Sequence, residues 1–402
     1  MPRLCPSAFL AAFLVLSPPA SAQQRPALRA AWEEMRSFYR ATLQSEGFVG
    51  SSLVLIRGDS TIGRDFYGMA DLATGRAVDS NTIYHWASIT KTFTAIAIMQ
   101  LRDRGLLSLD DPIVKYVPEL REVHDSFGSI DSVTIRHLLS HSAGFRNGTW
   151  PWGGDKPWHP FEPTRWAQVV AMMPYTEILF KPGSRYSYSN PGYIFLGRVI
   201  EALSGDDYEV YMEKNVLRPL GMTHSYFDRT PYHLLRYRSN NYTVVKGKPE
   251  PNGLDFDTGI TVSNGGLNAP FTDMTKYLQF LVGAPGISED ARNVLARSSL
   301  EEMWKGRVPV TDVAGADFKT APSDSIGMGY FILQNGGQRV IGHTGSQASF
   351  RAFFYINQDT RSAIIANFNT VGEENAEHPS VAPLFQGLLQ RYIAGILPAL
   401  RP

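Results

Sequence analysis

Apolar residues follow two different spacings along the first hundred residues of the chain. Between 29 and 44 they recur at the three- and four-residue spacing of an amphipathic helix. Two strand-like runs follow, at 51–57 and 60–67, and the Gly-Asp pair between them is typical of a hairpin turn. A second helical pattern starts near Ser88 and ends before Gly105, a residue type that favours helix termination. This part therefore predicts a helix, a hairpin and a second helix.

The pattern changes within 111–257, where short helical segments alternate with loops rich in proline and glycine. One short helix is predicted at 135–140. Another is predicted at 191–203, with Asn190 as its cap and Gly205 just past its end. We therefore expect this region to be mostly helical.

Strand-like segments return in the C-terminal part. The pattern predicts a helix from Thr272, strands at 327–334, 339–342, 349–357 and 361–368, and a last helix at 381–396. Strands near both ends of the chain with helices between them predict an α+β fold. We expect a sheet-and-helix domain made of 23–110 plus 258–402, into which the mostly helical region 111–257 is inserted.

Charge balance and cysteine content exclude several classes of function. Lysine plus arginine equals aspartate plus glutamate, 38 against 38, which argues against nucleic acid as a partner. The single cysteine, Cys5, lies in a segment, 1–22, with the charged start, apolar run and small-residue cleavage site of an export signal. The mature chain would then have no disulfide, thiol nucleophile or thiolate metal site. We expect a periplasmic or secreted protein with no membrane span after signal cleavage.

Ser88 and Lys91 lie three residues apart at the predicted start of a helix. Residues at this spacing share one helix face, so the hydroxyl and the amine would be neighbours. A lysine in a partly dry pocket can lose its proton and then take the proton of the serine, which makes the serine a nucleophile. The pattern alone is weak, because a chain of this size contains about one such match by chance.

A second candidate, Tyr188-Ser189-Asn190, lies on the loop that enters the helix at 191–203. A phenol can pass or hold a proton beside a serine, and an amide can hydrogen-bond both a lysine and a substrate carbonyl. Alone, the tripeptide also fits an aromatic turn capped by asparagine. Tyr355-Ile356-Asn357 has the same spacing, but it follows the third candidate in a predicted strand, so its order is wrong.

The third candidate, His343-Thr344-Gly345, is predicted to end one strand and to open the next. His343 is a group that titrates near neutrality, Thr344 offers a hydroxyl, and Gly345 lets a substrate backbone approach closely. Alone, the segment also fits a turn at a strand end with a surface histidine. The occurrence of all three candidates in this order favours a catalytic site.

Ser-x-x-Lys, Tyr-x-Asn and a basic residue before Thr-Gly together resemble the three-part pattern of the penicillin-recognising serine hydrolases. The Tyr-x-Asn version is similar to the branch of class C β-lactamases, D,D-peptidases and esterases. The likeness covers nearly all of the mature chain and includes 137–144, 182–190 and 265–267. It implies a β-lactamase/transpeptidase-like fold, an antiparallel sheet flanked by helices, with the active site in a cleft between the sheet domain and the helical region.

The resemblance also implies roles for individual residues. Ser88 would be the nucleophile, while Lys91 and Tyr188 would share its activation and the return of the proton; which of the two is the base stays open. Asn190 would orient Lys91 and the substrate. The backbone N–H groups of Ser88 and Ser346 would form the oxyanion hole.

His343 stands where class C β-lactamases typically have lysine, a departure that is similar to D,D-peptidases and esterases. We therefore expect an exported hydrolase that cleaves an ester or amide through an acyl-enzyme on Ser88, without a metal or organic cofactor. A true β-lactamase and a penicillin-binding or scaffold protein without turnover remain as alternatives. The natural substrate and the oligomeric state stay open.

Two further groups of residues suggest functions of their own. His137 and His141 are four apart and could face one metal ion, but no glutamate follows His137, and the resemblance makes the segment structural. Four of the seven tryptophans lie on a loop rich in glycine and proline, within 148–167. We expect Trp150 and Trp152 to line a flap that selects an apolar or aromatic acyl group; the alternative is a loop pinned to the surface by its own rings.

Overall fold

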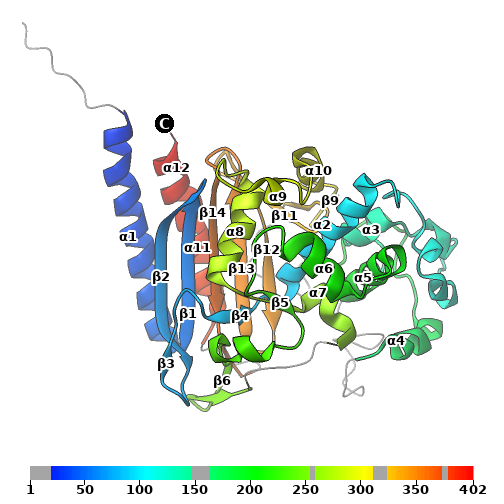
Figure 1. Ribbon diagram of the computed structural model, residues 1–402, viewed down its shortest axis with the longest axis horizontal. Coiled ribbons are helices and arrows are strands. Elements are labelled where there is room, and N and C mark those ends of the chain that lie inside the picture. Colours follow the sequence, from blue (N-terminus) through cyan, green and yellow to red (C-terminus); the bar gives the residue numbers. More distant parts are fainter. Residues whose placement is uncertain (1–19, 146–162, 254–258, 311–323, 374–378, 402) are drawn as a thin grey trace, which may run out of the picture.

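The computed structural model (Figure 1) describes residues 20–145, 163–253, 259–310, 324–373 and 379–401. Within them, nine strands form one antiparallel sheet in the order β3-β2-β1-β14-β13-β12-β11-β10-β9. The bounds of these strands are β1 (Gly50–Arg57), β2 (Ser60–Asp71), β3 (Arg76–Ala77), β9 (Val308–Pro309), β10 (Ser325–Ile326), β11 (Phe331–Asn335), β12 (Gln338–Gln347), β13 (Phe350–Asn357) and β14 (Ser362–Phe368). The sheet therefore joins β1 to β14, from opposite ends of the chain.

Two smaller sheets lie beside the large one. Their orders are β15-β6-β7 and β4-β8-β5 in the described part of the chain. The strands are β4 (Ile83–His85), β5 (Tyr226–Phe227), β6 (Tyr242–Val245), β7 (Lys248–Pro251), β8 (Leu267–Pro270) and β15 (Thr370–Gly372). Strand β4 leads directly into the turn that carries Ser88.

The helices flank the large sheet or gather at one side of it (Figure 1). Their bounds are α1 (Ala20–Glu46), α2 (Thr90–Asp103), α3 (Ile135–Leu139), α4 (Trp166–Met172), α5 (Asn190–Ser204), α6 (Tyr208–Met212), α7 (Val262–Gly265), α8 (Phe271–Val282), α9 (Glu289–Arg292), α10 (Arg297–Met303), α11 (Val381–Arg391) and α12 (Leu397–Leu400), with the 3₁₀ turn η1 (Ala87–Ile89) before α2. None of the helices in the described ranges has the length and apolar character needed to cross a membrane.

The two faces of the sheet bury separate apolar cores. Side chains alternate along β1, so Leu53 and Leu55 face the core shared with α1 and α11, while Val54 and Ile56 face the core shared with α2 and α8. Each face is thus covered by helices. The predicted α+β architecture, an antiparallel sheet flanked by helices, is confirmed. The division into a sheet-and-helix domain and an inserted helical region stays a prediction.

Several predicted boundaries were wrong; the strand predicted at 327–334, for example, begins at Phe331. Three others bear on motif and cap residues. Helix α5 begins at Asn190 itself, because Ser189 is the cap and its Oγ accepts the N–H of Gly192 at 3.2 Å. Helix α8 begins one residue before Thr272, so Thr272 is not its cap. Strand β12 does not end at Gly342, because its next five residues continue to pair with β13. His343-Thr344-Gly345 therefore lies inside a strand rather than at its end.

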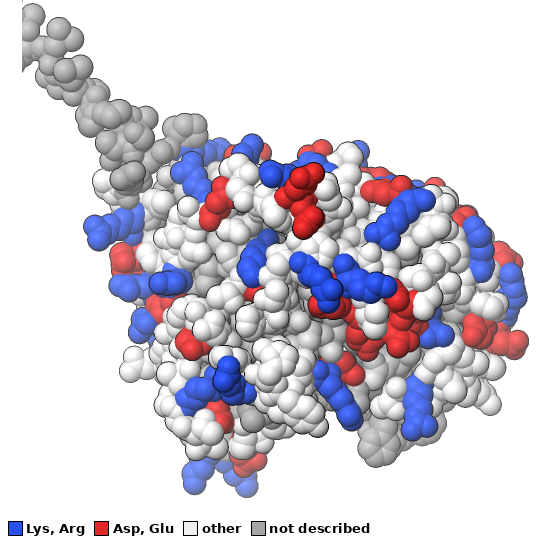
Figure 2. Space-filling model, viewed as in Figure 1, with Lys and Arg blue, Asp and Glu red and all other residues white. Residues whose placement is uncertain are grey.

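Charged side chains of both signs are spread over the face seen in Figure 2. Lysines and arginines lie close to aspartates and glutamates there. Among the described ion pairs, Arg136 Nε lies 2.7 Å from Asp110 Oδ1. This mixture agrees with the equal totals of the two signs, 38 and 38.

Candidate active site

Ser88 lies in η1, at the point where the chain turns into α2. The residue before it, Ala87, has a φ of +47°, a left-handed conformation that is strained for a residue with a Cβ. The neighbouring Trp86 is fully buried, and its Nε1 donates to the Ala269 carbonyl at 2.9 Å. Ser88 itself is only partly buried. The buried tryptophan therefore anchors a strained turn that leaves the serine accessible.

Lys91 brings its amine to Ser88. The side chain is fully buried, and Nζ lies 3.1 Å from Ser88 Oγ and 2.9 Å from the carbonyl oxygen of Asn264. Burial lowers the pKa of Lys91 well below 10.5. A neutral amine has a free electron pair, so Lys91 can take the Ser88 proton across the existing 3.1 Å contact.

Tyr188 completes the contacts of the serine. Its hydroxyl shares a hydrogen bond with Ser88, and its ring centroid lies 5.0 Å from Lys91 Nζ. Burial raises the pKa of Tyr188, and the weaker effect of the hydrogen bond to Ser88 does not cancel this rise. The phenol therefore keeps its proton near neutral pH and can donate it. The predicted convergence of these three side chains is present in the structure.

Asn190 does not make the contact with Lys91 that we expected. Within the described ranges, Lys91 hydrogen-bonds to Ser88 and to the backbone carbonyl of Asn264, at the end of α7. Asn190 opens α5, and its side-chain Oδ1 is buried without a hydrogen-bond partner in the described residues. The orienting group for Lys91 is thus Asn264, which sequence reasoning missed. A backbone carbonyl can come from any residue type, and the adjoining Gly265-Gly266-Leu267 was the sole signal nearby.

His343 is a buried, neutral side chain, contrary to its predicted titration near neutrality. It is 1% exposed, and its ring centroid lies 5.1 Å from that of Phe331 and 6.4 Å from that of Tyr188. Burial, and next the charge of Lys91, lower the pKa of His343 to about 3. Its Nδ1 donates to the Thr344 carbonyl at 2.6 Å, which leaves Nε2 as an unprotonated acceptor with no partner among the described groups.

The segment of β12 from His343 to Gln347 lies beside the Ser88 turn. Strand β11 pairs with β12 only as far as Gly342, whereas β13 pairs with β12 through Gln347. The side of β12 opposite β13 therefore packs against η1 at this point. Thr344 and Ser346 belong to this segment, and Ser346 is the register partner of Arg351. The oxyanion role of the Ser346 N–H remains a prediction.

Gly345 has a different role from the one expected. A Cβ at this position would fall closer than 3.0 Å to the carbonyl oxygen of Trp86 and 3.4 Å from Ala87 Cβ. The space beside Gly345 is thus filled by the chain itself. The glycine allows β12 to approach the turn that holds Ser88.

We expect Gly345→Ala to lower the free energy of unfolding by about 1–3 kcal/mol, because the added Cβ overlaps a backbone oxygen that cannot rotate away. Gly395→Ala is the matched control, since its Cβ would meet only Ala31 Cβ, at 3.7 Å. Urea unfolding of both variants measures the difference. Equal stability of the two would contradict the close approach of β12 and η1.

The remaining predicted residues do not form the flap or the metal site considered for them within the described part of the chain. Trp150 and Trp152 fall outside the described residues, so the flap stays a prediction. His137 and His141 each accept a backbone N–H through Nδ1, from Thr134 and Ser189 respectively, and no group of metal ligands exists among the described residues. The second match to the tyrosine motif is a core segment, as its position suggested, because Tyr355 is fully buried in the core that includes α11.

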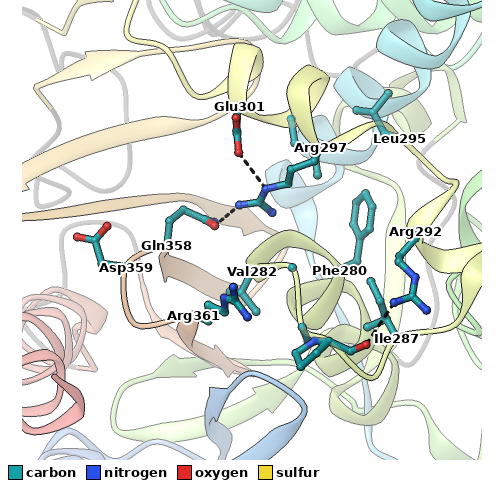
Figure 3. Close-up of a pocket in the computed structure, with 14 residues that line it drawn as sticks. Phe280, Val282, Ile287, Arg292, Leu295, Arg297, Glu301, Gln358, Asp359 and Arg361 are labelled. Atoms are coloured by element: carbon teal, nitrogen blue, oxygen red, sulfur yellow. Dashed lines mark hydrogen bonds and ion pairs between the residues drawn. The ribbon is translucent and has the colours of Figure 1, made fainter. Parts of the chain in front are cut away.

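Figure 3 shows a pocket of about 630 Å³ that contains none of the candidate residues. It lies between the end of α8, α9, α10 and the turn after β13. Its Arg297 donates to the Leu281 carbonyl at 2.7 Å and to Gln358, and pairs with Glu301 at 3.3 Å. These bonds tie α8, α10 and the turn together, so the arginine stabilises the fold here.

The Beta-lactamase family model matches residues 35–383. The chain belongs to the Beta-lactamase family. One relative is Protein flp of Staphylococcus aureus (strain COL). It is 24% identical to this chain over 334 residues, which are 82% of this chain and 61% of that protein. The chain therefore spans about three-fifths of the length of that relative.

Two more relatives extend the comparison. A putative D-alanyl-D-alanine carboxypeptidase of Escherichia coli (strain K12) is 29% identical over 198 residues, covering 45% of this chain and 44% of that protein. The solved structure of an octameric penicillin-binding protein homologue from Pyrococcus abyssi superimposes with a TM-score of 0.73 at 27% identity, covering 90% of this chain and 77% of that one. The predicted fold and the predicted family of serine hydrolases are confirmed.

Proposed function

We propose that this member of the Beta-lactamase family hydrolyses an ester or amide through an acyl-enzyme on Ser88. The observation that carries the proposal is the buried Lys91 amine, 3.1 Å from Ser88 Oγ. Burial lowers the pKa of this amine, and no carboxylate among the described residues contributes to the shift. The pair thus has the chemistry of an activated serine with its own base.

The lowered pKa of Lys91 and the raised pKa of Tyr188 support the following proton steps. Lys91 takes the proton of Ser88 as Oγ attacks the substrate carbonyl, and the Ser88 and Ser346 N–H groups stabilise the oxyanion. Tyr188 gives its proton to the leaving group and regains one from Lys91, which returns both side chains to their first state. In deacylation, water attacks the acyl carbonyl and gives one proton to the Lys91–Tyr188 pair. The same pair returns one proton to Ser88 Oγ as the carboxylic acid product departs.

A D,D-peptidase-like or esterase-like reaction is favoured over β-lactam hydrolysis. His343 replaces the lysine typical of class C β-lactamases, and its low pKa leaves no cation at that position near neutral pH. The Escherichia coli relative named as a putative carboxypeptidase supports the same direction. With the export signal proposed for residues 1–22, the enzyme would act in the periplasm or outside the cell.

Labelling with a fluorescent penicillin tests turnover directly. We expect the label to attach to the protein and to leave it again as Ser88 is deacylated, with hydrolysis of nitrophenyl esters in the same preparation. A permanent label without ester turnover would instead indicate a penicillin-binding or scaffold protein. Faster turnover of penicillins and cephalosporins than of esters and D-amino acid amides would indicate a true β-lactamase.

We expect kcat/KM for a nitrophenyl ester to fall as the pH is lowered through the pKa of Lys91. Above this lowered pKa the amine is neutral and can act as the base, whereas below it the amine is protonated and cannot. His343, with a pKa of about 3, stays neutral over the range from about pH 4 to about pH 9 and does not add to this loss.

Lys91→Arg provides the control for this profile, because a guanidinium does not lose its proton in proteins. The variant should be inactive at every pH in the range. A wild-type rate that rises toward acidic pH, or a Lys91→Arg variant that is as active as the wild type, would contradict the assignment of Lys91 as the base.

A further inference from the structure

His141 contacts the segment around Tyr188 in three ways. Its carbonyl oxygen accepts the N–H of Ser187 at 2.8 Å, and its Nδ1 accepts the N–H of Ser189 at 3.0 Å. Its ring stacks on the Tyr188 ring, with centroids 4.3 Å apart and planes 28° from parallel. One residue thus holds the backbone on both sides of the tyrosine and the face of its ring.

We propose that His141 is a positioning residue that holds the Tyr188 phenol against Ser88. The proposal rests on the function proposed above, because it gives His141 its part in the reaction of Ser88. His141 covers one face of the Tyr188 ring and binds the backbone N–H groups of the residues before and after Tyr188. These contacts keep the tyrosine hydroxyl from moving away from Ser88. Misplacement of a reacting group by about 1 Å can cost about 10²-fold in rate.

The backbone of His141 supports a role beyond packing. Its φ is +50°, a strained conformation for a residue other than glycine, at the turn that follows α3. His137, in the same short segment, uses its Nδ1 for the cap of its own helix, where it accepts the N–H of Thr134 at 3.3 Å. The two histidines therefore differ in what they stabilise. His137 caps its own helix, and His141 binds the segment around Tyr188.

The bonding of His141 also sets its protonation state. Because Nδ1 accepts an N–H, the neutral ring carries its hydrogen on Nε2, which is buried without a partner among the described groups. A second proton on Nδ1 would oppose the Ser189 N–H and break this contact. The rings of Tyr186, Tyr188 and Tyr193 lie against the His141 ring. Burial, and next the charges of Lys91 and His343, lower the pKa of His141. The contact therefore persists near neutral pH.

Two variants separate the contacts that His141 makes. His141→Phe keeps an aromatic ring on Tyr188 but loses the acceptor for Ser189, whereas His141→Asn keeps an acceptor and tolerates the positive φ but loses the stacked ring. We expect each to lower the kcat of ester hydrolysis by about 10- to 100-fold with little change in KM. His137→Asn is the matched control and should retain the wild-type kcat.

A double-mutant cycle with Tyr188→Phe distinguishes positioning from a general effect on structure. If His141 acts through Tyr188, His141→Phe should cause no further loss of rate in a Tyr188→Phe background. Additive losses, or wild-type rates in both His141 variants, would overturn the proposal. Circular dichroism checks folding, and His141→Asn carries the same cycle if His141→Phe does not fold. A wild-type protein that forms no acyl-enzyme on Ser88 would instead refute the proposed function.

Discussion

Replacing Ser88 by alanine is expected to abolish ester and amide hydrolysis while leaving the fold intact. The substitution removes the oxygen that forms the acyl bond, and only binding and the oxyanion donors remain. We expect turnover to fall by about 10⁴-fold or more, in line with the loss of a serine nucleophile elsewhere. Ser88 is partly exposed, and Trp86 and α2 hold its turn, so removing one hydroxyl should not alter the packing.

Ser225→Ala is the matched control for this variant. Ser225 is buried, and its Oγ donates to Asp273 Oδ2 at 3.0 Å, away from the candidate site. Its loss should leave turnover near the wild-type value. Circular dichroism and steady-state rates with a nitrophenyl ester compare the two variants. Equal turnover in Ser88→Ala and wild type would eliminate Ser88 as the nucleophile.

Replacing Lys91 by alanine is expected to slow acylation by about 10²- to 10⁴-fold, the range found when a general base is removed. The serine would remain in place but would keep its proton, because the Tyr188 phenol also keeps its own near neutral pH. Lys91→Met offers a second variant that fills the same volume with an apolar chain. Both variants should lose the rate to a similar extent, since neither carries a base.

Single-turnover kinetics with an activated ester measure this acylation step. A Lys91 variant that acylates at the wild-type rate would move the role of base to Tyr188. Tyr188→Phe then decides between the two, because the loss in that variant would have to exceed the loss in Lys91→Ala. We expect the opposite order, since the pKa of Lys91 is lowered and that of Tyr188 is raised.

Local spacing predicted the nucleophile and its neighbour, and distant contacts decided the rest. Ser88 and Lys91 are in contact because residues three apart in a helical turn share a face. This spacing can be read directly from the sequence. The contact of Lys91 with the Asn264 carbonyl depends on where α7 lies, and a backbone oxygen leaves no mark on residue type. The contacts of His141 with the segment around Tyr188 likewise depend on tertiary structure, since 48 positions separate His141 from Ser189.

The surroundings of the third motif were also not predictable from the sequence. The residue types of His343-Thr344-Gly345 were visible in the sequence, but their surroundings were not. Pairing with β13 keeps the segment in β12, and Phe331 and Tyr188 enclose the histidine ring, which turns a group expected to titrate near neutrality into one with a pKa of about 3. The fold class was predictable because hydrophobic periodicity is local, whereas a pKa depends on the whole enclosure.

Intact-protein mass spectrometry with peptide mapping, after a brief reaction with an activated ester or a penicillin, tests the central claim most directly. The account predicts one added acyl group on the peptide that contains Ser88, and its loss as hydrolysis proceeds. An acyl group on another residue would contradict the account. So would hydrolysis that continues while Ser88 stays unmodified in rapidly quenched samples, together with unchanged hydrolysis by Ser88→Ala.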